Sequence, residues 1–209
     1  MRDLGTLGGA TGVANAINDA GEVVGLADTS NSTHGFLWRN GAMTDLGTIG
    51  DDCFSGAFGI NAHTQVVGQS INCDFTVFRA FLWENGAMID LNIFVPAGSN
   101  LTLNDVEQIN DRGELFGIGT LADGNSRAFL LIPCDENHPN IEGCDYSMVD
   151  QDVLADGGRS GSARRQQTNS DRKLSSGEIG QMMKSANARS KNWFLFDRSH
   201  GRMASEFRL

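Results

Sequence analysis

The stretch Asp45-Leu46-Gly47-Thr48-Ile49-Gly50 decides the fold of this chain, because it occurs almost unchanged a second time. Residues 3–8 read Asp-Leu-Gly-Thr-Leu-Gly, which differs at one position, and a shorter echo follows at Asp90-Leu91-Asn92. Segments that recur at a regular period indicate that one structural unit has been copied along the chain. The sequence therefore predicts a repeat protein in which this stretch is the seam between consecutive units.

Each unit is predicted to contain four short strands. In the first unit these strands are expected at residues 14–18, 22–27, 34–38 and 42–46. The strongest local signal is Asn40-Gly41, since both positions accept the positive φ that a type I′ hairpin turn requires. Within the third strand, alternation places Phe36 and Trp38 on one face and Leu37 on the other.

Two further units repeat these parts. Phe36 matches Phe81, 45 residues later, and Phe81 matches Phe129 after 48 more. The second unit keeps its tryptophan and its Asn-Gly turn, whereas the third unit loses both and is predicted to be a terminal copy. The units are expected at about residues 3–44, 45–89 and 90–135.

A unit of about 45 residues with four strands has the size of one β-propeller blade. A sheet this small cannot bury both faces unless neighbouring units stack on it, and closed propellers use roughly four to eight blades. Three units therefore predict an all-β fold that forms a propeller-like partial array. A threefold, β-trefoil-like fold is the alternative.

The motifs resemble those of bacterial extracellular repeat proteins named for a His-Ala-Phe (HAF) triplet. The resemblance rests on the seam, on Ala16-Ile17-Asn18 with Val23-Val24-Gly25, and on His34-Gly35-Phe36-Leu37-Trp38. It covers residues 1 to about 135, although the naming triplet has Gly35 at its centre and begins with Arg79 and Arg127 in the later units. The resemblance implies secretion or surface display and a propeller-like fold, and it implies no known reaction.

Some residues recur at the same place in every unit. They are Asn18, Asn61 and Asn110, which follow an isoleucine, and Gly25, Gly68 and Gly117, which lie in the second strand. Such residues are expected to serve the unit itself, the asparagines by stabilising a hairpin turn and the glycines by allowing two backbones to approach closely. Phe36, Trp38, Phe81 and Trp83 are predicted core residues; the alternative is an exposed rim that stacks on sugars.

Four cysteines predict two disulfides, Cys53 with Cys73 and Cys134 with Cys144, because these pairings each close one local loop. Free buried thiols and a metal site are the less favoured alternatives. Disulfides form in oxidising compartments, so the chain is expected to be extracellular or at the cell surface. Since no export signal precedes the first repeat, the natural chain is expected to begin further upstream, and no apolar run is long enough to span a membrane.

The net charge of −10 is unevenly distributed. Residues 1–150 contain five basic and twenty acidic side chains, whereas residues 151–209 contain eleven basic and six acidic ones. The acidic body argues against a nucleic-acid ligand, since phosphate binding needs a basic face. The basic segment is predicted to be a solvated linker.

Residues 1–147 are expected to form the folded body, with the second cysteine loop at its end. From residue 148 to residue 209 the composition shifts to Gly, Ser, Arg and Gln, which predicts a largely disordered, low-complexity tail. A short helix is expected at residues 175–188. The apolar patch Trp193-Phe194-Leu195-Phe196 suits docking on the body and binding of a partner equally well.

Two stretches imitate catalytic motifs. Residues 117–122 resemble a dinucleotide-binding loop, but a strand follows instead of the helix that would hold a pyrophosphate. Ser126 faintly resembles the serine of a nucleophile elbow, yet it enters a strand. Both are interpreted as structural, so no catalytic or cofactor-binding residue is assigned.

Acidic pairs are the remaining site candidates. Asp51 with Asp52, or Asp135 and Glu136 near Asp145, offer oxygen ligands for calcium, although the spacing of a calcium loop is absent. The same acids are weak candidates for a glycosidase pair. The four histidines, His34, His63, His138 and His200, do not recur at one repeat position and are interpreted as surface or strand-end residues.

The favoured function is a non-catalytic, secreted or cell-surface repeat scaffold that binds protein or carbohydrate and uses no cofactor. Self-association is a further expectation, because repeat units stack on one another. The alternative is a fragment of an all-β hydrolase of the glycosidase type, in which Asp52 would be the first acid to test.

Overall fold

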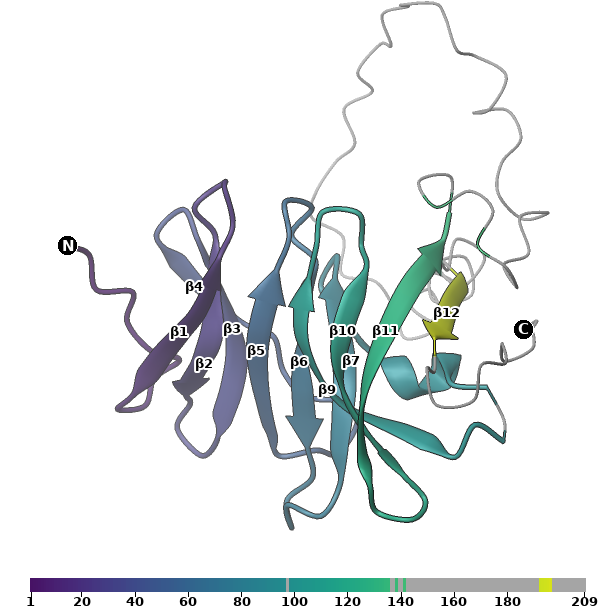
Figure 1. The fold of residues 1–209 in the computed structure, drawn as a ribbon. Helices are drawn as coiled ribbons and strands as arrows, with labels where there is room; N and C mark the ends of the chain where they lie inside the picture. Colours follow the sequence, from purple (N-terminus) through teal and green to yellow (C-terminus); the bar gives the residue numbers. More distant parts are fainter. Residues whose placement is uncertain (97, 136–137, 139–140, 142–191, 197–209) are drawn as a thin grey trace, which may run out of the picture.

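The computed structural model describes residues 1–96, 98–135, 138, 141 and 192–196. It confirms the all-β prediction, with three antiparallel sheets of four strands each (Figure 1). The predicted helix at residues 175–188 and most of the predicted tail lie outside the described residues.

Within each sheet the strands neighbour one another in chain order. The first sheet contains β1 (Gly12–Ile17), β2 (Val23–Asp28), β3 (Thr33–Arg39) and β4 (Ala42–Asp45). The second contains β5 (Phe54–Ile60), β6 (Val66–Ile71), β7 (Phe78–Glu84) and β8 (Ala87–Asp90). The third contains β9 (Leu101–Ile109), β10 (Leu115–Leu121), β11 (Ser126–Cys134) and β12 (Asn192–Phe196), and the short 3₁₀ helix η1 (Leu91–Phe94) precedes it.

The fourth strand of the third sheet comes from the predicted tail. In the first two sheets an Asn-Gly turn with positive φ at both residues, as at Asn40 (53°) and Gly41 (87°), joins the third strand to the fourth. The third unit lacks this turn, and β12 pairs antiparallel with β11 in its place, with Leu130 opposite Phe196 and Cys134 opposite Asn192. The apolar patch that the sequence left unassigned therefore docks on the body.

The three sheets stack in series. Strand β5 contacts β1, β2 and β3 of the first sheet, and β9 contacts β5, β6 and β7 of the second. The first and third sheets consequently lie at opposite ends of the array (Figure 1). This is the arrangement expected of a partial array of repeat units.

In the first and second sheets, the same face packs on the next sheet along the chain. We call it the forward face; it carries Val24 and Leu37 in the first sheet, Val67 and Leu82 in the second, and Phe116 and Leu130 in the third. The opposite, backward face carries Ile17, Ile60 and Ile109 in the three sheets. Side chains alternate along a strand and cross-strand pairs share a face, so this division follows from the register.

Two apolar layers fill the spaces between the sheets. In the first layer, Val24 and Leu37 pack against the backward face of the second sheet, which contributes Val66, Phe81 and Trp83, and Leu46 of the seam joins them. The second layer joins the forward face of the second sheet to the backward face of the third and is composed mainly of aliphatic side chains. These layers form the core, and each needs two sheets.

The aromatic residues of the third strands largely behave as predicted. Phe36, Phe81 and Trp83 are buried, so these three form core and no sugar-stacking rim. Trp38 is half-buried, and the guanidinium carbon of Arg2 lies 5.7 Å from its ring centroid.

The recurring asparagines stabilise their turns and also connect the units. Each Oδ1 accepts two backbone N–H groups of its own hairpin, for example those of His63 and Gln65 at Asn61. The side-chain Nδ2 of Asn18 donates to the carbonyl oxygen of Asn61 at 3.0 Å, and Nδ2 of Asn61 donates to that of Asn110 at 3.0 Å. The predicted turn role is confirmed, and a hydrogen-bonded ladder between the units is added to it.

Asn61→Ala is expected to lower the free energy of unfolding by about 2–3 kcal/mol, because the buried N–H of Gln65, the N–H of His63 and the carbonyl of Asn110 each lose a hydrogen bond. Urea denaturation followed by circular dichroism measures this. The matched control is Asn72→Ala, which removes two turn bonds of the same kind, to the N–H groups of Thr76 and Val77, without a bond to another unit, and should cost about 1 kcal/mol. Equal losses in the two variants would contradict a ladder between units.

The recurring glycines lie where a neighbouring backbone comes too close for a side chain. A Cβ at Gly25, Gly68 or Gly117 would overlap the carbonyl oxygen of Val13, Gly56 or Asp105, respectively. The cause is a β-bulge in the first strand of each unit, directly opposite the glycine, where one extra residue bends the strand. The predicted close approach is confirmed in all three sheets.

Gly68→Ala is expected to destabilise the chain by about 1–3 kcal/mol, because the added methyl group forces two strands apart. Thermal denaturation tests this expectation. Gly56→Ala on the adjacent strand is the control, since its nearest neighbour is a ring atom of Phe58 at 3.2 Å, and that ring can move. If Gly68→Ala were no worse than the control, the close approach would not be what requires glycine.

Candidate functional site

An open groove of about 830 Å³ lies where three segments meet. One wall is the connection between β6 and β7, and the other is formed by η1, the loop that follows it, and the paired ends of β9 and β10. Its polar lining consists of amides and hydroxyls from Thr76, Asn92, Ser99, Asn100, Thr102 and Thr120, among others. Val77, Val95 and Leu121 add apolar surface.

Local hydrogen bonds give the two walls their shape. In the β6–β7 connection, Oδ1 of Asn72 accepts the backbone N–H groups of Thr76 and Val77 at 2.9 Å. On the other wall, Asn92 both donates to and accepts from the backbone of Leu103, which fixes η1 against β9. Amide side chains that bind backbone in this way hold a loop without regular pairing.

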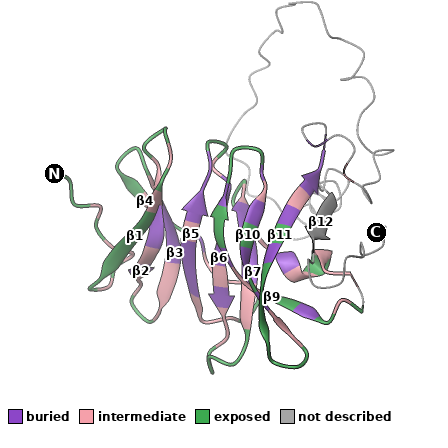
Figure 2. Ribbon diagram, in the orientation of Figure 1, coloured by how far each residue is buried: buried purple, intermediate pink, exposed green. Residues whose placement is uncertain are grey.

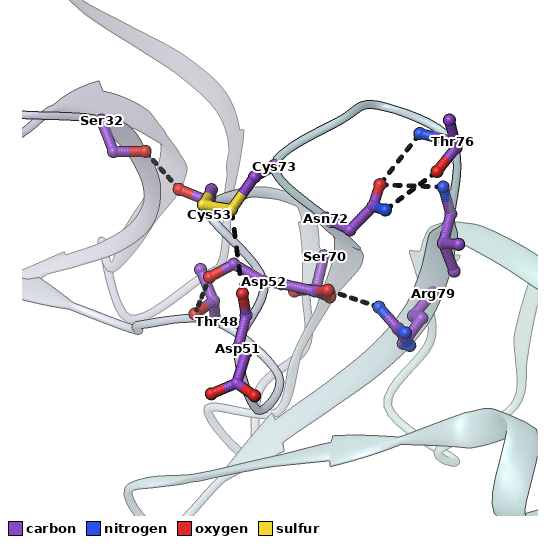
Figure 3. The surroundings of a disulfide bond; sticks show 11 residues. Ser32, Thr48, Asp51, Asp52, Cys53, Ser70, Asn72, Cys73, Thr76 and Arg79 are labelled. Carbon is purple, nitrogen blue, oxygen red and sulfur yellow. Dashed lines mark hydrogen bonds and ion pairs between the residues drawn. A yellow bond between two sulfur atoms is a disulfide. The ribbon is translucent and has the colours of Figure 1, made fainter.

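A disulfide between Cys53 and Cys73 ties the first wall to the start of β5 (Figure 3). This confirms the first predicted pairing. Next to the bridge, the rings of Phe54 and Phe75 lie with their centroids 4.5 Å apart, so the covalent link and an aromatic contact hold the same connection. Cys134 is also disulfide-bonded, and its predicted partner, Cys144, lies outside the described residues.

Asp52, the acid that the hydrolase alternative would test first, makes structural contacts inside the second sheet. The Asp52 carboxylate is almost completely buried, pairs with the guanidinium of Arg79 and accepts the hydroxyl of Ser70 at 2.8 Å (Figure 3). Asp51, its neighbour in sequence, is exposed. Asp52 therefore links the loop after the seam to β6 and β7, and neither acid lines the groove.

His138 lies between two carboxylates at the end of the third sheet. Its Nδ1 is 2.7 Å from Oδ1 of Asp135, and its Nε2 is 3.3 Å from Oε1 of Glu114. The ring is fully covered, so it joins the end of β11 to the turn between β9 and β10. The sequence predicts a surface or strand-end residue here; His138 does lie near the end of β11, but it is buried.

The other histidines and acids that the sequence suggested as site residues do not line the groove wherever the structure describes them. His34 pairs with Asp45 at 3.0 Å in the first sheet, and Glu136, Asp145 and His200 lie outside the described residues. Among the residues that the structure describes, no three His, Cys, Asp or Glu side chains are arranged to hold a metal ion. Along the same part of the chain, no helix combines the length and apolar character needed to cross a membrane.

One carboxylate beside the groove is electrostatically perturbed. Burial raises the pKa of Asp105 above its ordinary value, and a hydrogen bond from the backbone N–H of Ile118 opposes this shift. Asp105 follows the groove residue Asn104 but is not part of the lining. The lining consists of 15 described residues, all uncharged.

Sequence reasoning missed the groove, although the spacing of the repeats contains a signal. Asn18 and Asn61 are 43 residues apart, whereas Phe36 and Phe81 are 45 apart, which reveals two extra residues in the β6–β7 connection. The interval from Asn61 to Asn110 grows to 49, and part of this growth is the loop after η1. The groove thus forms between the two places where the second and third units depart from the first.

Comparison of the chain with models of protein families, with curated proteins and with solved structures found no match in any of the three.

Replacing Cys53 and Cys73 together by serine is expected to lower stability by about 3 kcal/mol, as loop-closure entropy predicts for two cysteines 20 residues apart. Urea denaturation of the unreduced proteins measures the difference without disturbing Cys134. An unchanged midpoint would contradict the stabilising role of the bridge. As a check on the bond itself, alkylation before reduction should modify neither cysteine.

Proposed function

We propose that this chain is a non-catalytic, extracellular repeat scaffold that binds a neutral carbohydrate in the groove between its second and third sheets. The resemblance to the extracellular HAF-repeat proteins supports the compartment, as do the disulfide bonds, which persist in oxidising surroundings. The groove supports the binding function.

The observation that carries the proposal is the chemistry of the groove lining. Amides and hydroxyls both donate and accept hydrogen bonds, which suits the hydroxyl groups of a sugar. Val77 and Leu121 offer apolar surface for the C–H face of a sugar ring. A neutral ligand fits because an ionised ligand would enter a site whose lining side chains carry no charge.

The Cys53–Cys73 bridge adds preorganisation. A loop that is held in place before binding loses less conformational entropy when the ligand arrives, so the same contacts give higher affinity. The bridge, the Phe54–Phe75 contact and the Asn72 hydrogen bonds all restrain the wall that carries Val77. This is the rigidity expected of a binding site built on loops.

The proposal is tested by screening the chain on an array of neutral oligosaccharides and measuring each hit by calorimetry. Val77→Arg should reduce binding at least tenfold, because a long charged side chain then occupies the groove. Ile93→Arg is the matched control: it changes an exposed apolar residue of η1 that does not line the groove and should leave binding unchanged.

Three results would overturn the proposal. They are the absence of binding to any neutral glycan, equal losses in the two variants, and reproducible cleavage of a bound glycan. Cleavage would favour the hydrolase interpretation, and Asp52→Asn would then be the first variant to assay.

A further inference from the structure

The forward face of the third sheet exposes apolar side chains that the other two sheets bury. Phe116 is 49% exposed and Leu130 is 38% exposed. Their equivalents, Val24 with Leu37 and Val67 with Leu82, are buried under the next sheet. Ile118, on the same face as Phe116, is exposed as well. This face has the composition of an interface between sheets, and no other described sheet packs on it.

The backward face of the first sheet shows the complementary feature. Ile17 is 68% exposed, whereas Ile60 and Ile109, at the same position of the later units, are buried by the preceding sheet. Strand β1 is correspondingly the exposed strand at the outer end of the array (Figure 2). On the same face Phe36, the equivalent of Phe81, is already buried within the chain, so the open part of this face is the β1 side around Ile17. The chain therefore presents the forward half of the contact that it makes twice internally, and the β1 part of the backward half.

The hydrogen bonds between units have an equivalent donor residue in the third unit and an equivalent acceptor in the first. Asn110 holds its turn like Asn18 and Asn61, and its Nδ2 donates to Glu114 at 2.6 Å as theirs donate to Glu22 and Gln65. In Asn18 and Asn61 the second N–H of the same Nδ2 donates to the next unit. The carbonyl of Asn18 is the equivalent acceptor at the other end.

A second hydrogen bond between units follows the same pattern. The N–H of Ala62 donates to the side chain of Asp111 in the next unit at 2.8 Å. Asp19 is the equivalent of Asp111 in the first unit, so it offers the same acceptor at that end of the array.

We propose that a second copy of this chain covers both end faces, with the third sheet of each copy packed on the first sheet of the other. The contact is head-to-tail, and it repeats the two internal contacts between sheets. Two chains then close a ring of twice three sheets, which falls within the roughly four to eight blades of closed propellers. Head-to-tail contacts that close in this way produce discrete oligomers instead of filaments.

A second copy fits better than the other occupants. A segment of the same chain, such as residues 142–191, would cover the forward face of the third sheet and leave Ile17 exposed. A contact between two forward faces would leave Ile17 exposed too, and it would place Asn110 opposite Asn110 with no carbonyl of Asn18 to receive its Nδ2. The head-to-tail contact covers Phe116 at one end and Ile17 at the other, and it gives Nδ2 of Asn110 an acceptor.

The test is the mass of the 209-residue chain in solution, measured by light scattering and native mass spectrometry over a dilution series. The expected mass is twice the chain mass of 22.5 kDa. Phe116→Asp and Ile17→Lys, at opposite ends of the array, should each convert the dimer to a monomer, because each places a charge in both contacts of the ring. Circular dichroism verifies that the variants remain folded.

Mixing the two variants separates this arrangement from any other dimer. A mixed pair contains one unchanged contact and one in which lysine faces aspartate, so mixing should restore a dimer of mixed mass. Ile93→Asp, at an exposed position of η1, is the control and should stay dimeric. A monomeric wild-type chain, or a dimer that Ile17→Lys leaves intact, would overturn the proposal.

Discussion

The structure depends on one constraint: a sheet of four short strands buries its forward face only against the backward face of another sheet. Backbone pairing is satisfied inside each sheet, so the apolar layers between sheets provide the stabilisation that no unit can provide alone. The hydrogen bond from Asn61 to Asn110 sets how closely two units approach, and the close contact at Gly68 sets how closely two strands of one sheet approach. Both contacts support this packing. The inter-unit bonds of Asn18 and Asn61 and the three recurring glycines thus act on this packing.

The groove arises where that repetition is interrupted. The seam between the first two units is short, whereas the connection between the second and third contains η1 and a longer loop. The β6–β7 connection opposite is also extended, and a disulfide restrains it. The repeated residues stabilise the stacked sheets, and the two insertions form the groove between the second and third sheets.

Much of the fold could be predicted from sequence because it is local. The Asn40-Gly41 turn, the alternation around Phe36 and the spacing of Cys53 and Cys73 depend on residues close together in the chain. The ladder from Asn18 to Asn61 and the groove were not predicted, since they depend on how the units stack. The docking of Trp193-Phe194-Leu195-Phe196 stayed open because an apolar patch does not specify which strand edge it pairs with.

The remote origin of β12 has a consequence for synthesis of the chain. The first two sheets are complete as soon as their fourth strands emerge, because an Asn-Gly turn joins those strands to the third. The third sheet must wait for residues that begin 58 positions after Cys134. Until then the outer edge of β11 presents unpaired backbone groups, the kind of edge on which chains aggregate. The pairing of β12 with β11 thus joins strands far apart in the sequence, which is a slow, non-local step.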